Sequence, residues 1–116
     1  MPRTILLIQP GERVEKRTYS RFQSIDDCME RVCKTYEGVL KRENPKMRII
    51  TYDITELFQF IDMLKDITCL VHQRDTNEYV PRNRDWIKDQ IHAKLHRTSI
   101  TSKVLKKKLA ENVHKE

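Results

Sequence analysis

Few residues in this sequence have the type and spacing that chemistry requires. His92 and His96 lie four residues apart in a segment with helical periodicity, so their side chains could share one helix face, as two metal ligands do. No third ligand of recognisable spacing follows them, and surface histidines on a basic helix are the simpler interpretation. Asp85 and Asp89 could be posed as an acid pair, but helix capping and a solvated face explain them more simply. The sequence therefore predicts no metal site.

Motifs for nucleophilic and phosphate chemistry are missing as well. Gly11 and Gly38 are the only glycines, so no glycine-rich loop could cradle a phosphate, and no serine lies in a G-x-S-x-G turn. Cys28, Cys33 and Cys69 form no CxxC pair and fall on apolar positions, which indicates buried free thiols. Nothing argues for an enzyme, and we expect no catalytic residue and no cofactor.

The composition indicates a single domain with a modest core. The chain has 116 residues, of which 38% are hydrophobic and 34% are charged, so its surface is well solvated. No apolar run approaches the length of a membrane span or of a signal peptide, so we expect an intracellular protein with no membrane partner. The net charge of +6 favours an acidic partner such as RNA.

Much of the positive charge lies at the C-terminal end. We expect residues 1–99 to form the domain and residues 100–116 to form a basic tail. Leu105, Leu109 and Val113 are spaced by four, so the tail is interpreted either as a flexible, solvated segment or as a helix that forms with a partner. A small RNA-binding domain that uses the third helix and this tail is the alternative function that the charge suggests.

The element that must organise the fold is the apolar stretch Thr4–Gln9, which reads as a strand stopped by Pro10-Gly11. Ile5 and Leu7 point to one face of this strand, and Leu6 and Ile8 point to the other. Both faces are therefore apolar. We expect helices of the same chain to cover one face and a second copy of the chain to cover the other, although these residues alone do not say which pair faces which way.

The remaining elements follow from periodicity, caps and breakers. Strands are predicted at 17–23, 67–72 and 78–80, with Pro81 closing the last, and 49–52 is a short extended piece. Helices are predicted from the cap Ser24 to Asn44, from the cap Asp53 through residue 64, and from about residue 85 to 97, capped by Asn83 or Asp85. This order predicts a two-layer α+β fold, with an antiparallel sheet and the helices on one face.

Several long motifs resemble the enhancer of rudimentary homologue family. They are TILLIQP from Thr4, SIDDCMERVCKTYE from Ser24, LKRENP from Leu40, ITYDITELFQFID from Ile50, CLVHQRDTNEYVP from Cys69 and RDWIKDQI from Arg84. The match runs without obvious gaps from about residue 4 to residue 97, and its motifs are specific to the family. Residues 103–116 lie beyond the family's usual end, and the resemblance does not explain them.

The resemblance implies a fold and an assembly. The family is a small α+β protein with a four-stranded antiparallel sheet and three helices, and it forms a homodimer through the sheets. By position, Ile5, Leu7 and Gln9 match family residues at the dimer interface, which leaves Leu6 and Ile8 for the helical core. The family is not enzymatic and uses no cofactor.

The resemblance also implies a function. Family members are dimeric scaffolds that bind short disordered segments of RNA-processing or RNA-binding proteins, with roles in RNA processing or decay and in small-RNA and piRNA pathways. The expected location is the nucleus, with a cytoplasmic or perinuclear-granule pool, and contact with RNA is expected to be indirect. His72, Val80 and the longer tail depart from the usual family pattern and are typical of a divergent paralogue with its own partners.

Ser24 has two interpretations. The resemblance places an acid-directed kinase site at this position, and Asp27 supplies the acid three residues on. A phosphate at a helix N-terminus would be electrostatically tolerated. An ordinary helix N-cap is the simpler interpretation.

Overall fold

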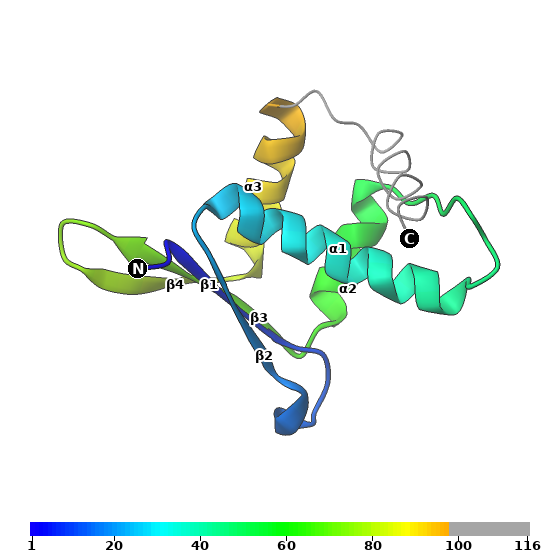
Figure 1. The fold of residues 1–116 in the computed structure, drawn as a ribbon, viewed down its shortest axis with the longest axis horizontal. Coiled ribbons are helices and arrows are strands. Elements are labelled where there is room, and N and C mark those ends of the chain that lie inside the picture. The colour runs from blue at the N-terminus through cyan, green and yellow to red at the C-terminus, as the bar shows by residue number, and fades with distance from the viewer. Residues whose placement is uncertain (98–116) are drawn as a thin grey trace.

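The protein folds as two layers, a sheet and a set of helices that cover one side of it (Figure 1). The structure is a computed structural model and describes residues 1–97. Within this range it has a four-stranded antiparallel sheet and three α-helices, which confirms the predicted α+β class. The predictions for the tail, residues 100–116, lie outside the described residues.

The elements follow the predicted order closely. The strands are β1 (Thr4–Gln9), β2 (Thr18–Phe22), β3 (Asp66–Gln73) and β4 (Glu78–Arg82). The helices are α1 (Ile25–Glu43), α2 (Ile54–Met63) and α3 (Arg84–Arg97), and a short 3₁₀ helix, η1 (Val14–Lys16), lies between β1 and β2. None of the helices in this part of the chain is both long enough and apolar enough to cross a membrane.

The sheet order is β2-β1-β3-β4, so the first strand is interior and β2 and β4 form the two edges. Ile5 lies opposite Arg21 on β2 and Leu70 on β3. Leu6 and Ile8 are 2% and 7% exposed and belong to the core beneath the helices. Because strand side chains alternate, Ile5 and Leu7 lie on the opposite face, where both are half-buried.

Each helix contributes an apolar face to one shared core. The buried residues include Cys28, Met29 and Val32 of α1, Leu57 and Ile61 of α2, Ile87, Ile91 and Leu95 of α3, and Ile67, Cys69 and Val71 of β3. Their spacing of three or four on the helices and of two on the strand is the pattern that buries one face of each element. All three cysteines are free and buried, as predicted, and the sulfur atoms of Cys28 and Cys69 lie 3.7 Å apart.

Side-chain caps fix where the helices begin. The Ser24 hydroxyl and the Asp53 carboxylate each accept a hydrogen bond from the backbone N–H three residues on, at 3.0 Å and 2.9 Å. Asn83 caps α3 in the same way, at 3.0 Å, so the choice left open between Asn83 and Asp85 falls to Asn83.

The boundaries of the elements lie within one or two residues of the sequence predictions. β4 does not close at Pro81 but continues to Arg82, because β4 is an edge strand and tolerates a residue that lacks an N–H donor. Residues 49–52 are the short extended piece that the sequence predicts: they form no strand, and Ile50 and Tyr52 are buried, at 4% and 3% exposed. This extended segment is held by its side chains rather than by a sheet ladder.

Candidate functional site

The face of the sheet turned away from the helices is the first candidate site. Ile5, Leu7 and Leu70 form a half-buried apolar centre on two neighbouring strands. Tyr19 lies opposite Leu7 on β2 and is 62% exposed, and Thr68 lies opposite Leu7 on β3. An apolar centre with a more polar surround is the usual anatomy of a protein interface. We call this surface the outer face.

Gln9, the third residue predicted at the dimer interface, is placed differently from Ile5 and Leu7. It is 5% exposed, and its carboxamide oxygen accepts hydrogen bonds from Arg17 Nε and Nη2 at 3.1 Å and 2.7 Å. Its Nε2 donates to the carbonyl oxygen of Gly11 at 2.8 Å. Both ends of this amide are therefore used within the chain, and Gln9 positions Arg17 beside the outer face.

The polar margin of the outer face near β4 is also ordered. His72 Nε2 and Asn77 Oδ1 lie 2.8 Å apart, and the His72 ring lies 5.1 Å from that of Tyr79. The Tyr79 hydroxyl donates to the carbonyl oxygen of Pro2 at 2.7 Å, which ties the N-terminus to the sheet. Asn77 has a φ of 58°, a left-handed conformation that asparagine tolerates in a tight turn.

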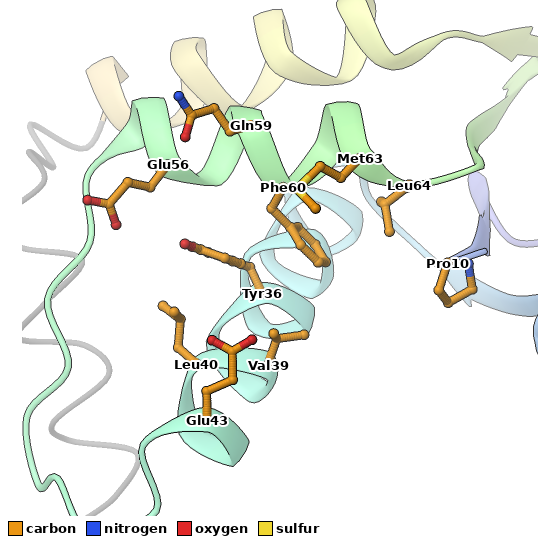
Figure 2. Close-up of a pocket in the computed structure, with 10 residues that line it drawn as sticks. All are labelled: Pro10, Tyr36, Val39, Leu40, Glu43, Glu56, Gln59, Phe60, Met63 and Leu64. Carbon is orange, nitrogen blue, oxygen red and sulfur yellow. The ribbon is translucent and has the colours of Figure 1, made fainter.

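The second candidate site is a groove between α1 and α2, on the helical side of the molecule (Figure 2). It encloses about 400 Å³ and is lined by Pro10, Tyr36, Val39, Leu40, Glu43, Glu56, Gln59, Phe60, Met63 and Leu64. The rings of Tyr36 and Phe60 lie 4.9 Å apart, and Met63 is 81% exposed. The groove therefore offers an apolar surface that no described residue covers.

The groove is also electrically negative. Glu43 of α1 and Glu56 of α2 stand on its two walls (Figure 2). Burial raises the pKa of the Tyr36 hydroxyl, and the carboxylates of Glu56, Glu43 and Asp53 raise it further. The same three carboxylates would attract a positively charged ligand.

A buried acidic group lies behind the groove. Glu37 is 3% exposed, and its Oε2 accepts a hydrogen bond of 2.6 Å from the Tyr52 hydroxyl, whereas its buried Oε1 has no hydrogen-bond partner among the described residues. Burial raises the pKa of Glu37, and the hydrogen bond from Tyr52 and the charge of Lys34 partly offset that rise. Burial and the neighbouring Glu37 raise the pKa of Cys33 to about 12, so this thiol stays protonated at neutral pH.

The groove and the buried acid were missed at the sequence level. Tyr36 and Phe60 fall on apolar positions of their helices, and their spacing alone does not indicate a groove between α1 and α2. Glu37 did leave a signal, because it lies four residues after Cys33 and eight after Met29, within the apolar stripe of α1.

Three cations of α3 are engaged within the chain. Arg84 Nη1 donates to the carbonyl oxygens of Ile61, Asp62 and Leu64 at the end of α2, at 3.0, 3.1 and 3.1 Å. Lys88 forms an ion pair with the Asp62 carboxylate at 2.5 Å. Lys94 likewise pairs with Glu30 of α1 at 3.7 Å. These contacts fasten α3 to its neighbours.

Residues 1–97 offer no candidate metal site. His92 and His96 are both exposed on α3, and this part of the chain contains no cluster of three or more histidine, cysteine or acidic side chains suited to a metal ion.

Comparison with known sequences places these features in a family. A profile of the family described as Enhancer of rudimentary matches residues 1–101, which include every element described above. The chain belongs to the enhancer of rudimentary family.

Relatives in the enhancer of rudimentary family come from distant organisms. The chain is 54% identical over 101 residues to the protein enhancer of rudimentary of Drosophila virilis, which covers 87% of this chain and 97% of that protein. It is 44% identical over 92 residues to the enhancer of rudimentary homolog of Caenorhabditis elegans (79% and 89%), and 40% identical over 87 residues to that of Arabidopsis thaliana (75% and 80%). None of these names describes a chemical reaction.

Ser24 caps α1, as the simpler interpretation predicted, and its use as a phosphorylation site stays a prediction. Replacing Ser24 with Ala should lower the free energy of unfolding by about 0.5–2 kcal/mol, because the N–H of Asp27 loses its acceptor. Urea denaturation of both proteins measures this. Ser24→Asp, which keeps an acceptor at the cap, is the control; equal losses in the two variants would contradict a capping role.

Proposed function

We propose that this chain is a non-enzymatic scaffold that pairs with a second copy through the outer face and holds two short segments of RNA-processing proteins side by side. The observation that carries the pairing is the outer face itself. All three helices pack on the other side of the sheet, and Ile5, Leu7 and Leu70 remain half-exposed. A two-fold axis would place this apolar centre against its own copy.

The energetics support such an arrangement. Fully burying an exposed aliphatic side chain stabilises by about 1.5–3 kcal/mol, and burying the exposed remainder of three half-buried side chains on each copy would contribute part of that amount for each. Left in water, the same residues would form an exposed apolar patch that favours aggregation. Gln9 and Arg17 fix one another beside this centre, so the polar margin is already organised before two copies meet.

The scaffold role is supported by family membership together with the site geometry. The groove between α1 and α2 has the apolar lining and partial enclosure that an extended or helical peptide requires. Because the groove lies on the helical side, pairing through the outer face leaves one groove open on each copy. Two weak sites held together then gain affinity for a partner with two motifs, or bring two partners together.

The proposed partners place the protein mainly in the nucleus, with a cytoplasmic or perinuclear-granule pool, in RNA processing, decay or small-RNA pathways. Direct RNA binding through α3 and the tail is the alternative. The contacts of Arg84, Lys88 and Lys94 do not favour it, because these cations are already engaged. Steeply salt-dependent binding of RNA by the isolated protein would support the alternative instead.

The pairing is tested by the mass of the wild-type protein in solution. The chain has a mass of 14.0 kDa, and we expect sedimentation equilibrium at low micromolar concentration to give twice this value. A mass that stays at that of one chain across the micromolar range would overturn the proposed scaffold.

A further inference from the structure

The groove between α1 and α2 has apolar side chains that no residue of 1–97 covers. Met63 is 81% exposed in this groove, and Val39, Leu40 and Phe60 are only half-buried. Pairing through the outer face would not cover them, because they lie on the helical side (Figures 1 and 2). A groove of this kind calls for an occupant with apolar side chains and, given Glu43 and Glu56 on its walls, positive charge.

The chain itself contains a segment of this chemistry. Leu105, Leu109 and Val113 have the spacing that puts three apolar side chains on one stripe of a helix, and Lys106 and Lys108 fall on either side of that stripe. Residues 98–116 hold five lysines and two glutamates, so the segment is positively charged where the groove is negative. The family profile ends at residue 101, and the segment is an extension beyond it.

The end of α3 lies close to one end of the groove. The contacts of Arg84 with the end of α2 show that α3 begins where α2 finishes. In both views α3 then runs back, so its C-terminal end lies on the side of the molecule where α2 begins and where Glu56 stands (Figures 1 and 2). The eight residues after Arg97, up to Leu105, span at most about 26–29 Å when extended. This reach is shorter than the longest dimension of the protein, 47 Å, so Leu105 can contact only surfaces on the side where α3 ends.

We propose that residues 103–113 of this chain occupy its own groove between α1 and α2, with Leu105 and Leu109 packed on the apolar lining and Lys106 and Lys108 facing Glu43 and Glu56. Since the groove is also the proposed site for partner segments, the tail competes with them and only partners that displace it bind. That consequence for partner binding rests on the proposed function, whereas occupancy of the groove by the tail does not.

The methionine methyl groups of the full-length protein provide the test. The chain has four methionines, and in residues 1–97 Met63 is exposed in the groove, Met47 is 50% exposed outside it, and Met29 is fully buried. A soluble gadolinium chelate broadens the NMR signals of methyl groups that solvent reaches. We expect the broadening of Met63 in the wild type to be several-fold weaker than that of Met47, and to rise to the level of Met47 in Leu105→Asp/Leu109→Asp.

A charge-matched control separates packing from simple charge. Lys107→Asp changes the net charge by the same two units but lies on the side of the helical stripe opposite Leu109, so Met63 should stay protected. Met29 reports in every variant that the core is intact. Reversing the groove charges with Glu43→Lys/Glu56→Lys should expose Met63 partly, because the apolar contacts remain.

Three results would overturn the proposal. The first is a Met63 methyl signal that the chelate broadens as strongly as that of Met47 in the wild type. The second is a Met63 signal that stays protected in Leu105→Asp/Leu109→Asp. The third is a Met63 signal that is broadened in Lys107→Asp as strongly as in Leu105→Asp/Leu109→Asp. Protection that persists in the tail variant but is lost on dilution would identify a second copy as the occupant. The mass measured on the same samples keeps the proposals apart, since a dimer with an open groove overturns tail docking alone and a monomer with a covered groove overturns the dimer alone.

Discussion

Replacing Ile5 and Leu7 with Arg should convert the proposed dimer into a folded monomer. Both side chains are half-buried at the apolar centre of the outer face, so each pair of copies would bring four guanidinium groups together without partners. Like charges juxtaposed across an interface cost several kcal/mol, and each 1.4 kcal/mol is a factor of ten, so the dissociation constant should rise by at least about a thousandfold. The fold should survive, because neither residue lies in the core beneath the helices.

Sedimentation equilibrium with circular dichroism of the same samples measures both expectations. Met47→Arg/Ile49→Arg is the matched control, because it adds the same charge at two residues that are 50% and 48% exposed after α1. The control should remain dimeric. A folded Ile5→Arg/Leu7→Arg variant that keeps the mass of two chains would exclude the outer face as the interface.

Removing the Tyr52 hydroxyl should destabilise the protein most at neutral pH. Tyr52→Phe leaves the buried Glu37 carboxylate without its hydrogen bond, and a lost partner for a buried group costs about 1–3 kcal/mol, with more for a charged one. The double variant Glu37→Gln/Tyr52→Phe should lose less than Tyr52→Phe alone, since no charge is then stranded. Urea denaturation at a fixed protein concentration gives the free energy of unfolding of the wild type, Tyr52→Phe and the double variant. An equal loss of stability in Tyr52→Phe and in the double variant would show that the charge of Glu37 plays no part.

The pH dependence of this effect has a definite sign. Burial raises the pKa of Glu37 above its ordinary value of 4.5, so the folded state binds more protons than the unfolded state between the two values. The contribution of Glu37 is therefore fully present below pH 4.5 and is lost as the pH rises through the raised pKa. Tyr52→Phe raises that pKa further, so its cost should shrink as the pH falls from 7 to 4.5, and Glu37→Gln should flatten the profile.

Much of the fold was accessible from local sequence patterns. Ser24 and Asp53 start their helices by hydrogen bonds within three residues, and such contacts do not depend on the rest of the fold. The facing of β1 was different, because Ile5, Leu6, Leu7 and Ile8 are all apolar and alternation alone cannot orient them. Only the family resemblance assigned Leu6 and Ile8 to the core, and the burial of both residues agrees with that assignment.

The groove could not be predicted, because it arises from the angle between two helices rather than from either helix alone. Tyr36 and Phe60 occupy ordinary apolar positions in their own periodicities. They become a surface because the neighbouring elements leave Met63 exposed and Val39 and Leu40 only half-buried around them. Sequence periodicity says which side of a helix is apolar, but not how much of that side the neighbouring elements cover.

The sheet order has a consequence for how far assembly can proceed. With β1 and β3 inside, both β2 and β4 present unpaired backbone groups, and strands joined along such borders could add copy after copy without limit. Pairing through the outer face would instead be saturated once two molecules have associated, so assembly would stop at two copies. Charged residues and proline on an edge strand disfavour edge-to-edge pairing, and Arg21 on β2 and Glu78 and Pro81 on β4 are such residues. They therefore favour a finite particle of fixed stoichiometry over an open-ended one.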